Sequence, residues 1–278
     1  MTSTAAATNI EWPDGSKAAA TITVNFDGES VERTATPDDP QWGRFSYGRY
    51  GAQVGVHRLL DLFEQRGVTA TFFIPAWDAE RHPEVSERIA AAGHEVAGHG
   101  YFHEDFSELT VAHQQDVLER SEQTFERVFG ARPTGWRAPD GLMSSATRSL
   151  LAARGYQYES SFPDDDVPYV VANEDGERLV ELPVFAGASD QLFYRAHRLP
   201  GVVAQAWRDE FAAVSGVGGL FVPTIHPRGD FGSGRSVRIK SVEALLDAIA
   251  ERDDVWLATC SEVAAYALAQ SEGEPLPA

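Results

Sequence analysis

Short runs of apolar residues recur along this chain and are separated by more polar stretches. The runs are rich in β-branched and aromatic side chains and are bounded by Gly, Pro and Asp, a pattern typical of buried strands. The predicted strands and extended segments are AAATITVNF (18–26), VTATFFIP (68–75), HEVAGHG (94–100), PTGWRAP (133–139), LVELPV (179–184), GLFVPTIHP (219–227) and VWLATC (255–260).

Between these runs the apolar positions change to a spacing of three and four, which predicts helices with one buried face. Val56, Leu59, Leu60 and Phe63 give the clearest example, with Gly67 as the residue that ends the helix. Further helices are predicted over 83–93, from Thr110 to Gly130, near 145–154, near 202–214, near 242–250 and after a cap at Ser261. The polar stretch between residues 27 and 50 shows neither spacing and is predicted to be a long functional loop.

Strands that alternate with helices indicate a mostly parallel sheet with helices packed outside it. Six or seven such units in about 260 residues suit a single distorted α/β barrel of the (β/α)7 type better than two domains. We therefore expect one domain over residues 1–278, with its core at about 18–265. The sequence shows no linker, internal repeat or low-complexity segment.

Charge and composition narrow the range of partners. The net charge is −19, from 23 Lys+Arg against 42 Asp+Glu, and it disfavours nucleic acid and anionic membranes as partners. The N-terminal MTSTAAATNIEWPDGSK lacks a basic region followed by an apolar run, and no apolar stretch reaches the roughly 20 residues that span a bilayer. We therefore expect a cytoplasmic protein. The single cysteine, Cys260, is expected to be a buried apolar residue.

Polar residues suited to catalysis or metal binding follow several of the predicted strands. They are Asp27 and Glu29 after the first strand, His99 and His103 after the third, and Arg137 and His226 at the ends of two later segments. In a parallel α/β barrel, the carboxyl ends of the strands meet at one rim, where the active site lies. We therefore expect these six side chains to converge.

The two histidines are a candidate metal site. His99 and His103 are four residues apart, which places both imidazoles on one face of a helix or tight turn. Asp27 and Glu29, two apart on an extended chain, would point the same way and could add a carboxylate. The alternatives are two polar loop histidines and an ordinary Asp-Gly turn. His94, at the start of its strand, is expected to hydrogen bond to the backbone instead.

These stretches resemble the motifs of the polysaccharide deacetylase family, also called carbohydrate esterase family 4, over about residues 18–265. NFDGE is similar to the aspartate motif at the end of the first strand, HEVAGHGYFH to the His-xxx-His motif, GWRAP to the arginine–proline motif, and TIHP to the late histidine motif. The resemblance implies a distorted barrel and a divalent cation, usually Zn²⁺, held by Glu29, His99 and His103.

The resemblance also implies roles in catalysis. Asp27 would be the general base, Arg137 would orient Asp27, and His226 would be the general acid that protonates the departing nitrogen. Most members carry two adjacent aspartates, whereas here Gly28 separates Asp27 from Glu29. Which of the two carboxylates is the base and which is the ligand therefore stays open.

The stretch FSYGRYGAQVGVHRLL (45–60) is similar to a branch of the family that includes cyclic imide hydrolases, allantoinase-like enzymes and cytoplasmic peptidoglycan-deacetylase-like proteins. In those relatives a loop after the first strand narrows the site. Here Tyr47, Arg49 and Tyr50 would supply that wall, and a backbone N–H near Tyr101 would stabilise the oxyanion.

The resemblance to this branch favours a metal-dependent hydrolase of non-peptide carbon–nitrogen bonds that acts on a small cyclic imide or amide. It also favours a homotetramer. One alternative is an N-acetyl deacetylase acting on amino-sugar polymers or peptidoglycan fragments. An alternative of another class is a non-catalytic binding protein on the same scaffold.

Overall fold

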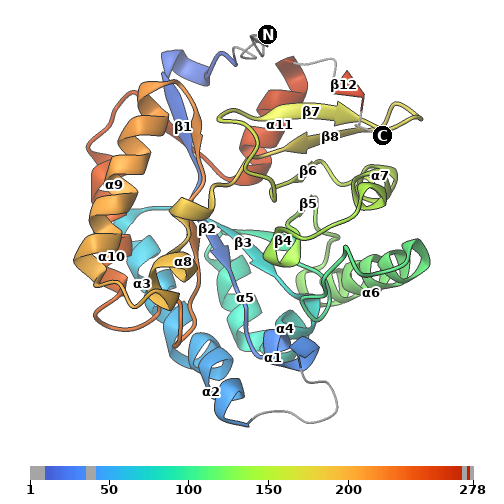
Figure 1. The fold of residues 1–278 in the computed structure, drawn as a ribbon, viewed down its shortest axis with the longest axis horizontal. Helices are drawn as coiled ribbons and strands as arrows, with labels where there is room; N and C mark the ends of the chain where they lie inside the picture. Colours follow the sequence, from blue (N-terminus) through green and yellow to red (C-terminus); the bar gives the residue numbers. More distant parts are fainter. Residues whose placement is uncertain (1–9, 36–41, 271–273, 276–278) are drawn as a thin grey trace.

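The computed structural model describes residues 10–35, 42–270 and 274–275. Most strands belong to one curled sheet in the middle of the molecule, and the helices lie around it (Figure 1). In spatial order this sheet contains β10 (Thr224–Ile225), β2 (Thr23–Asn25), β3 (Thr71–Ile74), β4 (Glu95–Gly98), β5 (Gly135–Trp136), β6 (Tyr158–Glu159), β8 (Arg178–Glu181), β7 (Tyr169–Ala172) and β12 (Glu274–Pro275). All neighbours from β10 to β8 pair in parallel, and β7 pairs antiparallel with β8.

A second, smaller sheet lies beside the first and contains the chain segments that lead into β2 and β10. It consists of β11 (Val255–Leu257), β1 (Ala18–Ala20) and β9 (Leu220–Phe221), all parallel. β1 runs on into β2, and β9 runs on into β10, so the same two chain segments cross both sheets. The ring is completed on the far side by a single bridge between Ser189 and Thr224. The prediction of a distorted (β/α) barrel with parallel strands is therefore confirmed.

The helices cover the outside of the strands. They are α1 (Ser30–Ala35), α2 (Trp42–Tyr50), α3 (Val56–Arg66), α4 (Ala76–Arg81), α5 (Pro83–Ala91), α6 (Val111–Phe129), α7 (Ser145–Ala153), α8 (Asp190–Arg195), α9 (Pro200–Gly216), α10 (Ile239–Ala250) and α11 (Cys260–Gln270). A π-helical turn, η2 (Gly51–Gly55), joins α2 to α3, and short 3₁₀ turns lie at η1 (Pro13–Gly15), η3 (Pro139–Gly141) and η4 (Ala186–Ala188). Within the described ranges, no helix combines the length and the apolar character needed to cross a bilayer.

The predicted helix faces and helix ends are largely confirmed. Val56, Leu59, Leu60 and Phe63 on α3 are all buried, and Gly67 ends that helix in the left-handed conformation with a φ of 62°. Burial of this apolar stripe against the sheet is the main source of stability for such a helix.

Helix caps and single buried residues test the sequence predictions more finely. Thr110 caps α6 by accepting a hydrogen bond from the backbone of the first turn. Cys260 is fully buried, and His94 accepts the backbone N–H of Ala70, both as expected. The last helix begins two residues earlier than predicted, because Thr259 rather than Ser261 exchanges capping hydrogen bonds with Glu262.

The stretch between residues 27 and 50 is not the long loop that was predicted. Among its described residues it forms α1 and α2, and η2 follows directly. The prediction was wrong because α2 is mostly polar and rich in glycine, so it lacks the apolar stripe that identifies a helix in sequence. The antiparallel strand β7 and the short helices α4 and α8 were likewise not predicted.

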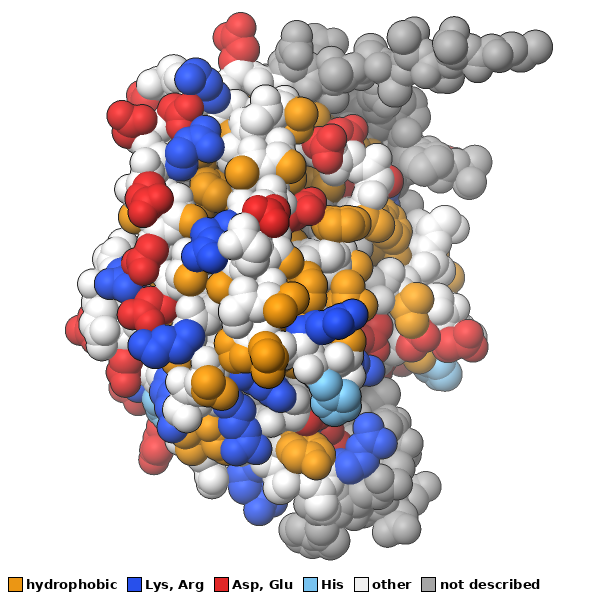
Figure 2. Space-filling model, turned by 60° about the vertical axis from the view of Figure 1, so that its left-hand side comes forward, with side chains coloured by type: hydrophobic (Ala, Val, Ile, Leu, Met, Phe, Trp, Pro, Cys, Tyr) orange, Lys and Arg blue, Asp and Glu red, His pale blue; other side chains and the backbone are white. Residues whose placement is uncertain are grey.

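One face of the molecule carries exposed apolar side chains. Figure 2 turns the side with α8 and α9 forward, where apolar side chains gather in the middle with Lys and Arg among them. Phe185, Leu192, Leu199 and Val202 are all about half exposed or more. Surfaces of this kind are suited to packing against another molecule, while the homotetramer stays a prediction.

Candidate metal centre

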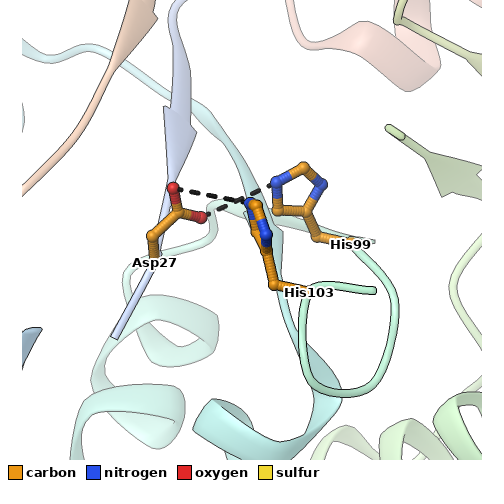
Figure 3. Close-up of side chains that lie close together, drawn as sticks. All are labelled: Asp27, His99 and His103. Carbon is orange, nitrogen blue, oxygen red and sulfur yellow. Dashed lines mark ion pairs between the residues drawn. The ribbon is translucent and has the colours of Figure 1, made fainter. Parts of the chain in front are cut away.

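Three potential metal ligands meet at the carboxyl ends of β2 and β4. One nitrogen or oxygen atom from each of Asp27, His99 and His103 lies within 4.8 Å of the others, and all three residues are buried. His99 Nε2 is 3.6 Å from Asp27 Oδ1, and His103 Nε2 is 3.9 Å from Asp27 Oδ2. Figure 3 shows both imidazoles turned toward the carboxylate. The structure thus brings together the predicted histidine pair and one of the two predicted carboxylates.

The protonation of His99 suits it to bind a cation. Its Nδ1 lies 2.8 Å from the carbonyl oxygen of Arg137, which can only accept, so Nδ1 carries the proton and donates it. The lone pair is therefore on Nε2, which faces Asp27. Burial, together with the charge of His103, lowers the pKa of His99 to about 3, so the ring is neutral near pH 7.

Asp27 supplies a negative charge with an unsatisfied oxygen. Burial acts to raise the pKa of Asp27, but the charges of His103, His226 and His99 outweigh it and lower the pKa below its usual range. Its Oδ1 is buried and has no hydrogen-bond partner among the described residues. A lone pair on Oδ1 thus faces a lone pair on Nε2 of His99, and a cation between them would satisfy both. Two imidazoles and a carboxylate are a common donor set for Zn²⁺, so the residues present fit the implied metal.

His103 occupies an unusual backbone conformation. Its φ is 68°, in the left-handed region that residues other than glycine seldom adopt. Such strained residues cluster at functional sites, where surrounding structure holds them in place. The turn after β4 thereby brings His103 back beside His99, with ring centroids 4.9 Å apart.

Glu29 does not join this group, contrary to the expected ligand set. Its carboxylate lies 3.0 Å from His82 Nε2, 3.3 Å from Arg49 Nε and 3.4 Å from Arg81 Nε. The cause is local backbone geometry, since β2 ends at Asn25 and α1 begins at Ser30. Alternation of side chains holds only along an extended chain, so two carboxylates two residues apart diverge here.

A buried aspartate holds this turn in place. Asp78 accepts the backbone N–H groups of Gly28 and Ser30 at 2.9 and 3.2 Å, and it also accepts from the Ser30 hydroxyl. Burial raises the pKa of Asp78 to about 6. The turn that separates Asp27 from Glu29 is therefore held by hydrogen bonds to a side chain of α4.

Arg137 orients Asn25 rather than Asp27, which corrects a second expectation. Its Nη1 donates to Asn25 Oδ1 at 2.9 Å and to Thr23 Oγ1 at 3.1 Å, and its Nε donates to the carbonyl of Ser160 at 2.8 Å. Because a guanidinium only donates, Asn25 must present its oxygen to Arg137 and its Nδ2 to the site. Nδ2 lies 3.4 Å from His99 Nε2. Asn25 is the last residue of β2 and precedes Asp27 by two positions. This spacing places both side chains on one face of an extended chain and could have identified Asn25 as a site residue.

His226 reaches the same centre from β10, as predicted. Its Nε2 lies 3.5 Å from Asp27 Oδ2, and its Nδ1 lies 2.6 Å from Asp190 Oδ1. Burial acts to lower the pKa of His226, but the charge of Asp190 and the hydrogen bond to it raise the pKa above the usual value. Asp190 also accepts the backbone N–H groups of His226 and Ser233. Sequence reasoning missed Asp190, because nothing near it in the chain signals a histidine 36 residues later.

A cavity of about 320 Å³ adjoins these residues. Its polar side includes Asn25, Asp27, His103, Arg137 and His226. Its lining also includes the apolar residues Phe162, Pro163, Val184 and Phe185. The cavity thus combines candidate catalytic groups with side chains that can pack against a carbon skeleton.

None of the four expected substrate-binding residues lines this cavity among the described residues. Tyr47 and Tyr50 lie on α2, and Arg49 is paired with Glu29. The Tyr101 N–H donates to Glu104 at 2.9 Å, so it is not free to bind an oxyanion. Three of the four lie on the helix α2 rather than on a loop, and a contact of these residues with substrate stays a prediction.

The geometry agrees with what comparison with known proteins shows. Residues 45–159 match the family model described as polysaccharide deacetylase. The crystal structure of a Mycobacterium smegmatis protein whose name assigns it to the polysaccharide deacetylases is 36% identical, with a TM-score of 0.90, and covers 97% of this chain and 96% of that one. The structure of PuuE allantoinase has the same fold, with a TM-score of 0.86 at 22% identity over 95% of this chain and 96% of that one.

A peptidoglycan deacetylase from Helicobacter pylori is 37% identical over 137 residues. The match covers 49% of this chain and 45% of that protein. The matched part of this chain therefore spans less than half of the length of that relative.

Proposed function

Because this chain belongs to the polysaccharide deacetylase family, we propose that it is a metal-dependent hydrolase of non-peptide carbon–nitrogen bonds. We propose Asp27, His99 and His103 as the metal ligands. The observation that carries the proposal is the buried Oδ1 of Asp27, which has no hydrogen-bond partner among the described residues and faces the lone pair on Nε2 of His99. A divalent cation bound there would polarise an amide carbonyl and lower the pKa of a water molecule.

The proposed proton-transfer group is His226, held by Asp190. With Nδ1 donating to Asp190, Nε2 of His226 faces Asp27 and the cavity. His226 would accept the proton of the attacking water and deliver it to the departing nitrogen. This extends the general-acid role expected of His226, because Asp27 serves as a ligand in this proposal and Arg137 orients an amide.

Asn25 is proposed to contact the substrate. Arg137 fixes the amide so that Nδ2 faces the site, where it can donate a hydrogen bond to the carbonyl oxygen under attack. An uncharged donor of this kind stabilises developing negative charge and takes up no proton.

A compact substrate, such as a small cyclic imide or amide, is the preferred candidate. The cavity of about 320 Å³ is at the small end of the range of roughly 300–1,000 Å³ found for ligand pockets. Its apolar wall of Phe162, Pro163, Val184 and Phe185 suits a ring that carries few charged groups. The fold shared with PuuE allantoinase is compatible with such a substrate.

An N-acetylated amino sugar is the second candidate substrate. It is favoured by the 37% identity over 137 residues to the Helicobacter pylori peptidoglycan deacetylase and by the family-model match over residues 45–159, which include His99, His103 and Arg137. The chemistry would be the same, since both substrates present an amide carbonyl and a nitrogen leaving group.

The proposal is tested by removing the metal and offering both classes of substrate. The protein is stripped with EDTA, and elemental analysis verifies the loss of metal. Ring opening of succinimide, hydantoin and allantoin is compared with acetate release from N-acetylglucosamine oligomers, before and after Zn²⁺ is restored. We expect turnover only with metal, on one of the two sets.

Equal rates with and without metal would show that the metal-dependent mechanism is wrong. A protein that binds Zn²⁺ and binds these compounds without converting any of them would instead favour a non-catalytic binding protein on this scaffold.

A further inference from the structure

We propose that two glycines, Gly48 of α2 and Gly55 of η2, form a clamp that sets the distance between the loop carrying Asp27 and the loop carrying His226. These two and Gly51, which lies between them, make up what we call the glycine face. This inference deepens the proposed function and rests on it, because it concerns how the metal ligand and the proton-transfer group are positioned.

Gly48 packs directly on the peptide that follows Asp27. A Cβ at Gly48 would overlap the carbonyl oxygen of Gly28 and would lie 2.9 Å from the backbone nitrogen of Glu29, closer than real Cβ atoms come. Both neighbours are backbone atoms and cannot move aside as a flexible side chain can. The Asp27 loop therefore lies as close to α2 as it does only because residue 48 has no side chain.

Gly55 makes the equivalent contact with the peptide that follows His226. A Cβ there would overlap the carbonyl oxygen of Pro227, and the same is true of Gly234 on the other side of that carbonyl. Gly51 lies between the two contacts, where a Cβ would be 3.5 Å from backbone atoms of Pro227 and Arg228. Such a distance is an ordinary contact, so the two ends of the glycine face are the critical positions.

Backbone conformation does not explain these glycines. None of the three has a positive φ, since they lie in helical segments that any residue can adopt. Glycine destabilises a helix interior relative to alanine. Close approach to the two loops is the physical reason that remains for glycine at Gly48 and Gly55.

Arg228 connects the two loops that the glycine face contacts. It follows His226 by two residues and is fully buried. Its Nη1 donates to the carbonyl of Gly28 at 2.9 Å, the same carbonyl on which Gly48 packs, and it also contacts Glu32. The Gly28 peptide is thus held between α2 on one side and the His226 loop on the other. The result is the 3.5 Å separation of Asp27 Oδ2 and His226 Nε2.

The test uses a series of Gly→Ala variants on one helical segment. Gly43→Ala is the matched control, because residue 43 lies on the same helix and a Cβ there meets nothing within 4 Å. Gly51→Ala is a second control with an ordinary contact. Gly48→Ala and Gly55→Ala test the two ends. Folding is checked by circular dichroism, Zn²⁺ affinity by competition with a chelator, and turnover at saturating Zn²⁺.

The two ends should give different results. Gly48→Ala displaces the loop of a proposed ligand, so Zn²⁺ affinity should fall at least about tenfold, as for losses of support around a metal site. Gly55→Ala displaces the His226 loop, so kcat should fall at least about tenfold while Zn²⁺ affinity stays within about threefold. Both controls should match the unaltered protein in both measurements.

Two outcomes would overturn the inference, and a third would overturn the proposed function. If Gly48→Ala and Gly55→Ala fold and keep both Zn²⁺ affinity and kcat, the glycine face does not position the loops. If both fail to fold while the controls fold, the glycines serve the fold rather than the spacing of the site. If the unaltered protein binds no Zn²⁺, the proposed function fails instead. The clamp is then decided by a crystal structure of Gly48→Ala, in which an unmoved Gly28 carbonyl would contradict it.

Discussion

The two ends of the barrel contain similar groups that are used differently. His94 and Glu95, where β4 begins, line a cavity of about 650 Å³, and the turn after the other end of β4 carries His103, which lines the cavity of about 320 Å³. Each end therefore has a buried histidine, a carboxylate and a cavity. The larger hollow is at the amino ends of the strands, opposite the proposed metal centre.

The difference lies in whether the polar groups are satisfied. At the amino end, His94 accepts a backbone N–H, and Glu95 accepts hydrogen bonds from Thr71, Tyr158 and Ser261. At the carboxyl end, Asp27 keeps a buried oxygen without a partner among the described residues. Buried polar groups are nearly always paired, so an unpaired carboxylate oxygen that faces two imidazoles supports the proposed metal site. Satisfied hydrogen bonds, rather than cavity size, separate the structural end from the functional one.

The largest expected effect follows from removing the carboxylate at the functional end. Asp27→Ala should weaken Zn²⁺ binding more than about 100-fold, beyond the loss typical of supporting residues, because the only negative group of the proposed ligand set is lost. Chelator competition measures the affinity. Glu95→Gln, the matched change at the other end, should leave Zn²⁺ affinity unchanged, and equal losses in the two variants would remove the distinction between the ends.

A smaller effect is expected when the support of His226 is altered. The amide of Asp190→Asn has only one acceptor oxygen and cannot accept all three hydrogen bonds that Asp190 accepts, so His226 should lose its fixed ring orientation and kcat should fall about 100-fold. Zn²⁺ affinity should remain within a few-fold in the same chelator assay. A variant with normal kcat would show that the Asp190–His226 pair does not carry protons in turnover.

Asn25→Ala should have a milder effect on turnover. Loss of one neutral hydrogen bond to the reacting carbonyl should lower kcat about tenfold, with the binding of Zn²⁺ preserved. Asn25→Asp separates two explanations, since a carboxylate cannot donate this hydrogen bond. If Asn25→Asp were faster than the unaltered protein, the position would favour a base over a donor.

The smallest expected effect concerns stability at the structural end. Burial raises the pKa of Glu95 above its ordinary value of 4.5, although the hydrogen bond from Tyr158 opposes this. The folded protein thus holds this proton more tightly than the unfolded chain, so the associated stability is present at low pH and is lost as pH rises through the raised pKa. Glu95→Gln removes this dependence. Its Tm relative to the unaltered protein should rise as the pH increases above the ordinary Glu pKa of 4.5.

A flat difference between the two Tm curves over that range would contradict the raised pKa. It would leave the hydrogen bonds of Glu95 as the only basis for the contrast between the two ends.

The positions of site residues that directly follow strands could be predicted from the sequence. The positions of residues in the turns beyond the strand ends could not. His99 and His103 could be placed beside Asp27 because the carboxyl ends of parallel strands share a rim. The position of Glu29 could not be predicted, because the turn at residues 28–30 is held by hydrogen bonds to Asp78, about 50 residues later in the chain. Asp190 was missed for a similar reason, since its contact with His226 depends on how the chain crosses from β8 to β10.

Helices, too, could be predicted only where a local sequence pattern reflects their packing. α3 was predicted because its apolar face is buried in the core, whereas α2 presents glycines to two loops and has no comparable stripe. The cytoplasmic location and the homotetramer stay predictions, as does the extent of the domain.

The single bridge between Ser189 and Thr224 has a consequence for diversification of this fold. Between Phe185 and Ala188 the chain forms part of the cavity wall without belonging to a strand ladder. Substitutions of Phe185 or Ala186 would change the cavity lining without removing a residue of a strand ladder. A seam of this kind allows chains with one reaction chemistry to acquire new molecules as substrates by changing a few residues at the place where the ring closes.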